Sequence, residues 1–277
     1  YGEYLRDREM SENTVGKYLR DAENFLQFSN GREISRELMM EYKSYILNAW
    51  KISSVNSMIT AVNSYLKWAG QAEFSIHTCR VQKQIFREKS RELGKEEYYR
   101  LLNAAVSEKR ERLSGILRTI AATGMRIGEL RYLTVETLSR QKIEIYFKGK
   151  QRVILMARSL VIFLRDYCRR NRITSGIIFA TKNGNPVDRR NIWVEMKELC
   201  EPARVLPSKV FPHNLRHLFA RCFYERERDL VRLADYLGHS SIETTRRYTM
   251  ITSEEACARE LELGLAGNES WGGAEKK

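Results

Sequence analysis

The stretch KIEIYFKGKQRVILM, residues 142–156, contains the strand pattern that distinguishes this chain from an all-helical protein. Ile143, Ile145 and Phe147 alternate with polar residues, so one face of an extended segment is apolar and the other is polar. A turn containing Gly149 follows, and residues 153–155 form a second apolar run. The pattern predicts a β-hairpin of two short strands.

The first 79 residues show helical periodicity instead. Apolar side chains recur at the spacing i, i+3, i+4, i+7 in three successive segments, which follow candidate helix caps at Ser11, at Ser35 and at Ser53 or Ser54. The first 185 residues contain no proline, which also favours helices. We therefore predict a small all-helical domain over residues 1–79.

The rest of the chain divides into three further parts. Residues 80–93, RVQKQIFREKSREL, are highly charged and weakly periodic, which indicates an extended basic linker. Residues 94–265 combine the hairpin with several helical patterns, and residues 266–277 are rich in glycine and charge and are predicted to be disordered. The predicted fold class is mainly α with a small β-hairpin (α+β), arranged in two domains.

The net charge of +13 points to a polyanionic partner. Residues 1–79 carry nine Lys and Arg against ten Asp and Glu, so the remaining 39 basic and 25 acidic residues lie downstream. A basic surface of this size attracts nucleic acid, because each neutralised phosphate releases condensed counterions. The excess of positive charge therefore places the expected nucleic-acid contacts mainly in the second domain.

Other compositional features exclude some classes of protein. No run approaches 18 consecutive apolar residues, so no membrane span is predicted, and the start of the chain lacks a signal-peptide pattern. A cytoplasmic protein is the expectation. The five cysteines are odd in number and never form a Cys-x-x-Cys pair, which argues against a disulfide framework and against a thiolate zinc site.

Six residues of the second domain could together carry out chemistry on an anion. None is a carboxylate, and a divalent metal usually needs Asp, Glu or thiolate ligands, so we predict neither a metal nor another cofactor. Guanidinium groups grip phosphate oxygens, lysine can donate a proton, and a deprotonated phenol is a nucleophile. The set suits phosphoryl transfer to tyrosine without metal, and its members are Arg126, Lys148, His213, Arg216, His239 and Tyr248.

Five motifs give the chain a family resemblance. TGMRIGEL (123–130), FKGKQR (147–152), HNLRH (213–217), LGH (237–239) and then Tyr248 resemble, in order and in separation, the tyrosine recombinase (phage integrase) family. The resemblance covers roughly residues 95–265, and the helical segment before it is similar to the core-binding (SAM-like) domain of that family. It implies a site-specific DNA recombinase or integrase, of the Xer type or from a small mobile element, that acts without metal or ATP.

The resemblance also implies a role for each residue. Arg126 and Arg216 would clamp the scissile phosphate, with His213 beside them exchanging a proton. Lys148 would protonate the leaving 5′ oxygen, and His239 would hydrogen-bond a non-bridging oxygen. Tyr248 would form a 3′-phosphotyrosine link. Glu129 would orient the first arginine.

The turn of the hairpin departs from the family pattern. The family commonly has Gly-Asn-Lys-x-Arg after the lysine, and FKGKQR is one residue shorter, so Lys148 and Lys150 compete for the role of general acid. We favour Lys148, because it ends the first strand and matches the first lysine of the motif. Lys150 and Arg152 are then expected to contact the DNA backbone.

The resemblance further implies partners and a location. The partner would be a double-stranded DNA recombination site, in the cytoplasm and associated with a bacterial nucleoid, with no membrane involved. The segment SEEACARELELGLA (253–266) would pack on a neighbouring protomer, giving a homotetramer on DNA and a monomer in free solution. Docking of this segment on its own domain is the alternative.

Three other interpretations compete. A zinc site built from His213, His217 and His239 would lack an acidic general base, and His217 is expected to be structural. A type IB topoisomerase would share the nucleophile and the clamp but would relax DNA without site preference. A non-catalytic DNA-binding regulator is disfavoured because all six catalytic positions are filled.

Overall fold

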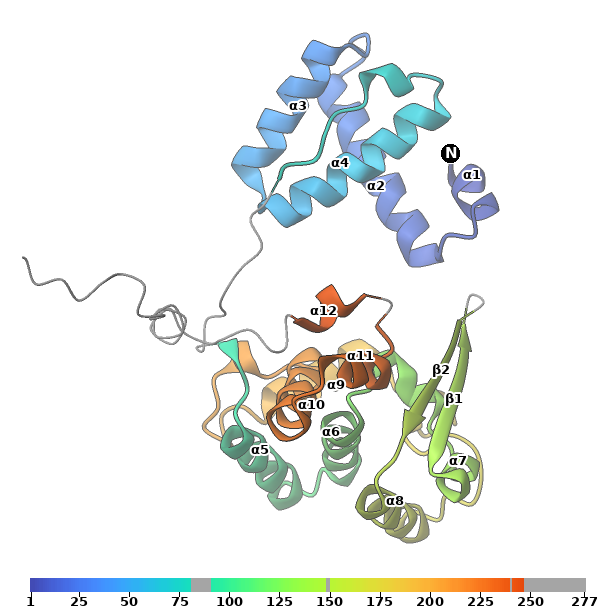
Figure 1. The fold of residues 1–277 in the computed structure, drawn as a ribbon, viewed down its shortest axis with the longest axis vertical. Coiled ribbons are helices and arrows are strands. Elements are labelled where there is room, and N and C mark those ends of the chain that lie inside the picture. Colours follow the sequence, from blue (N-terminus) through green and yellow to red (C-terminus); the bar gives the residue numbers. More distant parts are fainter. Residues whose placement is uncertain (81–90, 148–149, 240, 247–277) are drawn as a thin grey trace, which may run out of the picture. The chain divides into compact units, whose positions relative to one another are not determined.

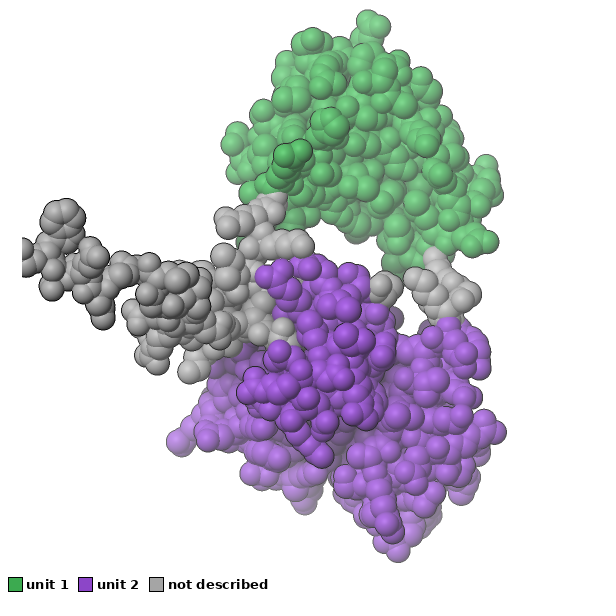
Figure 2. All heavy atoms as spheres, viewed as in Figure 1, with its two compact units in different colours: residues 1–83 green, residues 84–277 purple. Residues whose placement is uncertain are grey.

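The computed structural model describes residues 1–80, 91–147, 150–239 and 241–246. The chain separates into two compact units, residues 1–83 and 84–277, which are coloured green and purple in Figure 2. No helix within the described ranges is both long enough and apolar enough to cross a membrane.

The regular elements described in the first unit, over residues 1–80, are all helices. Its helices are α1 (Gly2–Asp7), α2 (Glu12–Ser29), α3 (Arg36–Ala49), α4 (Ile52–Trp68) and the 3₁₀ turn η1 (Ala72–Phe74). The hydroxyl groups of Ser11 and Ser35 accept hydrogen bonds from the first turns of α2 and α3, as predicted. The predicted cap of the third helix is wrong, because α4 begins earlier, after Lys51, whose side chain makes no capping bond.

Two asparagines of α4 fasten the chain that leaves this unit. Asn63 donates to the carbonyl of Ile76 (2.8 Å) and accepts from its amide (3.1 Å). Asn56 makes the same pair of bonds with Cys79, at 2.9 and 2.7 Å. Each side-chain amide thus replaces the partner that a neighbouring strand would provide, and the segment follows α4 as far as Cys79.

The second unit is mainly helical with one two-stranded sheet, which confirms the predicted fold class (Figure 1). Its elements are α5 (Lys95–Ser107), α6 (Glu111–Thr123), η3 (Ile127–Tyr132), α7 (Val135–Arg140), β1 (Lys142–Phe147), β2 (Lys150–Leu155), α8 (Arg158–Arg170), α9 (Arg189–Glu198), η4 (Pro207–Lys209), α10 (Pro212–Glu227), α11 (Leu230–Leu237) and α12 (Ile242–Arg246). Helix α6 is buried along most of its length and packs against α5, α8, α9 and α10.

The hairpin forms where the alternating pattern predicts it. Strands β1 and β2 are antiparallel, with Ile143 opposite Ile154 and Ile145 opposite Arg152. The three isoleucines are buried, whereas Tyr146 is 68% exposed, so the sheet has one inner and one outer face. The inner face is the one that reaches the candidate site.

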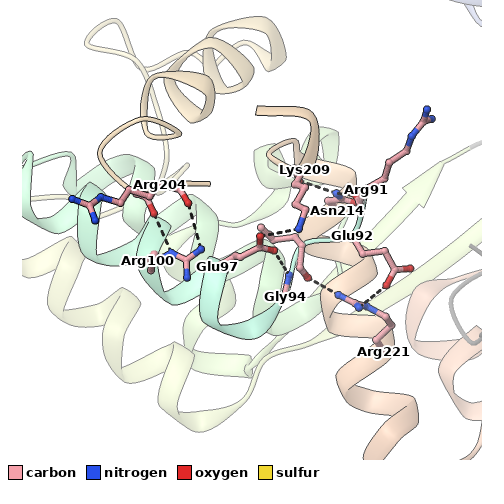
Figure 3. Close-up of polar contacts among 11 residues, drawn as sticks. Arg91, Glu92, Gly94, Glu97, Arg100, Arg204, Lys209, Asn214 and Arg221 are labelled. Atoms are coloured by element: carbon pink, nitrogen blue, oxygen red, sulfur yellow. Dashed lines mark hydrogen bonds and ion pairs between the residues drawn. The ribbon is translucent and has the colours of Figure 1, made fainter. Parts of the chain in front are cut away.

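The beginning of the second unit is tied to helix α10 (Figure 3). Asn214 donates from its amide nitrogen to the carbonyls of Arg91 and Lys209, each at 2.8 Å. Further along α10, the guanidinium of Arg221 donates to the carboxylate of Glu92 at 2.6 Å. These contacts fix the position of α10, the helix that carries two of the predicted catalytic residues.

Candidate active site

Arg126 lies in the short connection between α6 and η3. Helix α6 ends at Gly124, which has φ +63°, and a Cβ atom there would lie 2.5 Å from the ring of Phe219. Only glycine combines this left-handed backbone with so close an approach. The sharp turn delivers Arg126 to the start of η3, where its side chain is 47% exposed.

Glu129 binds Arg126 twice and a second arginine once. One carboxylate oxygen accepts the backbone N–H of Arg126 at 2.7 Å, and the other accepts its Nη1 at 3.0 Å. That second oxygen also accepts Nη1 of Arg152. The carboxylate therefore has the geometry required to orient Arg126.

Arg216 is buried in α10, with 1% of its surface exposed. Its Nη1 donates to the carbonyl of Gly124 at 2.6 Å, and its Nη2 donates to the carbonyl of Leu237 at 2.8 Å. These carbonyls lie at the C-terminal ends of α6 and α11, where helices leave acceptors without helical partners and where the dipole favours a cation. Two helix ends therefore position this guanidinium.

His239 lies beside Arg216, directly after α11. Its Nε2 is 2.8 Å from Nη2 of Arg216, and its Nδ1 is 2.9 Å from Oγ1 of Thr245 in α12. Because a guanidinium only donates, Nε2 must accept, which places the ring proton on Nδ1. Burial and the nearby charge of Arg216 lower the pKa of His239 to about 4, in agreement with a neutral ring.

His213 is exposed on the first turn of α10. Its ring lies nearly at a right angle to that of His217, with 4.5 Å between ring centroids. His217 is buried, as expected for a structural histidine. No group of three or more His, Cys, Asp or Glu in the described part of the chain is arranged to hold a metal ion.

A cavity of about 620 Å³ lies between four of these residues, and His239 is not part of its lining. Arg126, Glu129, His213 and Arg216 all line it, together with Ile145 of the inner hairpin face. Sequence reasoning missed two further cations in its lining, Arg131 and Arg189. The signal for Arg189 was its position at the first turn of a helix that follows a capping aspartate. The concentration of guanidinium groups suits this cavity to an anion.

Three predicted site residues receive no side-chain geometry. Lys148 and Tyr248 lie outside the described residues, and Lys150 is placed only as the first residue of β2. Strand β1 ends at Phe147 and α12 ends at Arg246. Lys148 and Tyr248 therefore each follow a described element by no more than two positions in the sequence. Their roles remain predictions.

Comparison with known proteins shows the class to which this fold and site belong. The family description "Phage integrase family" matches residues 91–255, and "Phage integrase, N-terminal SAM-like domain" matches residues 1–73. The chain belongs to the phage integrase family, which is the tyrosine recombinase family. This confirms the resemblance predicted from the sequence motifs.

Two curated relatives match nearly the whole chain. "Tyrosine recombinase XerA" of Pyrococcus furiosus is 27% identical over 264 residues, covering 92% of this chain and 89% of the relative. "Tyrosine recombinase XerD" of Staphylococcus aureus is 26% identical over 280 residues, covering 91% and 94%. Both relatives are named as enzymes of DNA recombination.

Solved structures show the same fold. The crystal structure of XerA recombinase matches with a TM-score of 0.53 at 26% identity and covers 93% of this chain and 94% of that one. A lambda integrase tetramer bound to a Holliday junction matches with a TM-score of 0.69 at 16% identity and covers 90% and 74%. The second likeness concerns the fold alone.

Proposed function

We propose that this protein is a site-specific DNA recombinase or integrase that cleaves and rejoins DNA through a 3′-phosphotyrosine intermediate on Tyr248. The observation that carries the proposal is the convergence of Arg126, His213 and Arg216 on one cavity, with His239 bonded to Arg216. Family membership supplies the reaction class. The arginine side chains that line the cavity would face the negatively charged oxygens of a bound phosphodiester.

The two arginines have different parts in this proposal. Arg126 is the more exposed and is oriented by Glu129, so it can meet a phosphate that arrives on DNA. Arg216 is fixed by helix-end carbonyls before any substrate binds. A preorganised donor does not need to reorganise as negative charge develops in the transition state, which is how such sites lower the barrier.

Proton transfer and attack fall to the remaining residues. His213, beside the arginines, accepts or donates a proton. Lys148 protonates the leaving 5′ oxygen, and Lys150 contacts a phosphate of the DNA backbone. Tyr248 attacks the phosphorus and breaks the bond to the 5′ oxygen. Because the phosphodiester energy is kept in the covalent link, a new 5′ hydroxyl can attack it, and neither ATP nor a metal is consumed.

The assembly is part of the same proposal. A protomer that cuts one strand must be paired with others for strands to be exchanged between two duplexes, so we propose a monomer in solution and a homotetramer on paired DNA sites. The similar lambda integrase structure is a tetramer bound to a Holliday junction. A head-to-tail contact between protomers would close into a ring on this scaffold.

The test is the detection and mapping of a covalent adduct. The protein is incubated with the genomic DNA that flanks its gene, and denaturing gels locate any protein attached to a 3′ end. Tyr248→Phe is expected to abolish the adduct while leaving DNA binding within about threefold, because the phenol oxygen is the nucleophile. Tyr236→Phe, a tyrosine on α11 that packs against Phe223, is the matched control and should still form the adduct.

Other results would contradict the proposal. An adduct of undiminished yield in Tyr248→Phe would mean that another residue attacks. Relaxation of supercoiled plasmid without site preference would indicate a topoisomerase. Loss of the adduct in EDTA, restored by zinc or magnesium, would indicate a metal-dependent reaction.

A further inference from the structure

Arg152 lies on the inner face of the hairpin. It is paired with Ile145, and directly opposed residues of an antiparallel pair project to the same face. Ile145 is buried and lines the cavity, whereas Val153, the next residue along β2, is 39% exposed. The side chain of Arg152 is only 10% exposed. This placement differs from the DNA-backbone contact that the sequence suggests.

The contacts of Arg152 connect it to Arg126. Its Nη1 and the Nη1 of Arg126 donate to the same carboxylate oxygen of Glu129. One carboxylate alone would neutralise Arg126. Shared between two guanidinium groups, it leaves a formal charge of about +1 on the three side chains, so Arg126 still faces the cavity as part of a cationic group.

Arg152 also contacts the chain just before His239. A Cβ atom at Gly238 would lie 2.7 Å from both Cδ and Nε of Arg152, and Gly238 has φ +61°. The Arg152 stem therefore packs directly on this backbone. His239 follows Gly238 in the chain and binds Arg216. The side chain of Arg152 therefore reaches from the loop that carries Arg126 to the Arg216–His239 pair.

The remaining nitrogens of Arg152 are buried. Its Nε and Nη2 have no hydrogen-bond partner among the described residues. Burying guanidinium nitrogens without hydrogen-bond partners destabilises the folded state. If Arg152 served only to stabilise the fold, an apolar side chain would therefore do so better. Because these atoms are enclosed by protein, they are also poorly placed to meet a phosphate on the surface.

We propose that Arg152 is a positioning residue for DNA cleavage: it holds Glu129 against Arg126, keeps that group cationic, and sets the spacing between Arg126 and the Arg216–His239 pair. The proposal rests on the proposed function, since it assumes that the cavity binds the scissile phosphate. It assigns Arg152 to the active site instead of to the DNA-binding surface.

The first test separates cleavage from binding. Single-turnover formation of the covalent complex is measured at saturating protein on a nicked duplex carrying the mapped site, and affinity is measured on the intact duplex. Arg152→Gln is expected to slow cleavage about 10- to 100-fold, the usual effect of removing a residue that orients a catalytic group. Affinity should change less than about threefold, and Arg152→Lys, which keeps the charge, should recover part of the rate.

A double-mutant cycle asks whether Arg152 acts through Glu129. Substitutions that act through one contact are not additive. Arg152→Gln combined with Glu129→Gln should therefore cleave about as slowly as the slower single variant. If the two losses in rate multiply, Arg152 acts on the substrate independently and the proposal is wrong.

Glycine substitutions test the packing contact. Gly238→Ala places a methyl group against Arg152 and should slow cleavage as Arg152→Gln does. Gly184→Ala is the matched control, because Gly184 also has a positive φ (+76°) but no atom lies within 4 Å of the position that a methyl group would take there. Melting temperatures of both variants show how much of any loss is due to folding. Equal cleavage rates in the two alanine variants would contradict the contact's role.

Two further outcomes have definite meanings. If Arg152→Gln cleaves at the wild-type rate but binds more weakly, with a salt dependence reduced by about one phosphate contact, Arg152 is a backbone contact and the proposal fails. If wild-type protein forms no adduct, the proposed function fails instead. An NMR titration of His239 adds a readout of the contact at Gly238: Arg152→Gln should raise the pKa of His239, because Arg152 is one of the charges that lower it, and an unchanged pKa would contradict the contact.

Discussion

His239 is held as a neutral ring whose Nε2 already has a donor, Arg216. Nε2 accepts from Arg216 and Nδ1 bonds Thr245, so the ring orientation is fixed before DNA binds. To donate to a phosphate oxygen, Nε2 must first gain a proton. A bound phosphate favours that step, because its negative charge offsets the arginines that lower the pKa of His239.

The low pKa of His239 predicts a pH dependence of stability. The pKa is about 4 in the folded protein and 6.5 in the unfolded chain, so the unfolded chain binds the proton more readily below pH 6.5. The contribution of the neutral ring to stability is complete above pH 6.5 and is lost as the pH falls toward 4. Urea unfolding should show this loss in the wild type and a smaller one in His239→Gln, which cannot titrate there. Equal pH slopes in the two proteins would contradict the prediction.

At the same scale, sequence spacing predicted which residues meet but not every contact. Arg126, His213 and Arg216 were found because motif order fixes them, and the structure brings them to one cavity. Arg152 was expected to contact the DNA backbone, because Lys148 was matched to the lysine of the family motif and this left Lys150 and Arg152 to bind phosphate. The register of the hairpin places Arg152 opposite Ile145, and this pairing was the signal for an inward side chain. Its bond to Glu129 depends on tertiary packing, which no local pattern encodes.

Among the elements, α10 matters most, because it carries His213 and Arg216 and is anchored at its first turn. Asn214 is 4% exposed and donates to two backbone carbonyls from different segments, Arg91 and Lys209 (Figure 3). A typical hydrogen bond contributes about 0.5–1.5 kcal/mol to stability, and this amide makes two of them. The position of the first turn of α10 therefore depends on an amide that has no part in the proposed reaction.

Substitution of Asn214 should lower stability in a defined order. Asn214→Asp keeps the shape of the side chain but replaces its donor with a carboxylate that faces two carbonyl oxygens, so it should melt at a lower temperature than Asn214→Ala, which should melt below the wild type. Asn103→Asp, on the exposed surface of α5, is the control and should change the melting temperature little. A melting temperature of Asn214→Asp equal to that of the wild type would mean that the amide is dispensable.

Element boundaries were predictable where a local signal sets them. Serine hydroxyls cap α2 and α3, and a left-handed glycine ends α6, each through contacts within one turn. Helix α1 was not predicted, and α4 begins without a side-chain cap. The segment MRIGELRYL (125–133) contains the 3₁₀ turn η3, whose tighter winding suits the bonds between Arg126 and Glu129.

For the whole molecule, assembly is the property that a single chain does not display. The segment 253–266, which was predicted to dock on a neighbouring protomer, lies outside the described residues. The prediction rests on the sequence: a short helix with so few leucines has too little apolar area to be stable alone and would need a surface on which to pack. The identity of that surface decides whether recombination is cooperative between protomers.

Truncation tests the assembly. Removal of all residues after Ser253 should leave single-site DNA binding unchanged and eliminate the slowly migrating complex of two paired sites, as seen by native gel electrophoresis. Tyr248 remains in this variant, so covalent attachment to a single nicked site should persist. Normal pairing and strand exchange by the truncated protein would instead support docking of the segment on its own domain.

Arg216 stabilises the fold in addition to the catalytic role proposed for it, since the ends of α6 and α11 and the ring of His239 all bind this one side chain. Cells that produce Arg216→Ala would accumulate less soluble protein, because three acceptors lose their donor at once. A genetic screen would then find no recombinants in either of two cases: when the variant protein is present but inactive, and when it has been degraded. Under the proposed function, Tyr248→Phe is consequently the better inactive allele for studies in cells, whereas a phenotype caused by a change at Arg216 can be interpreted only beside a measurement of protein abundance.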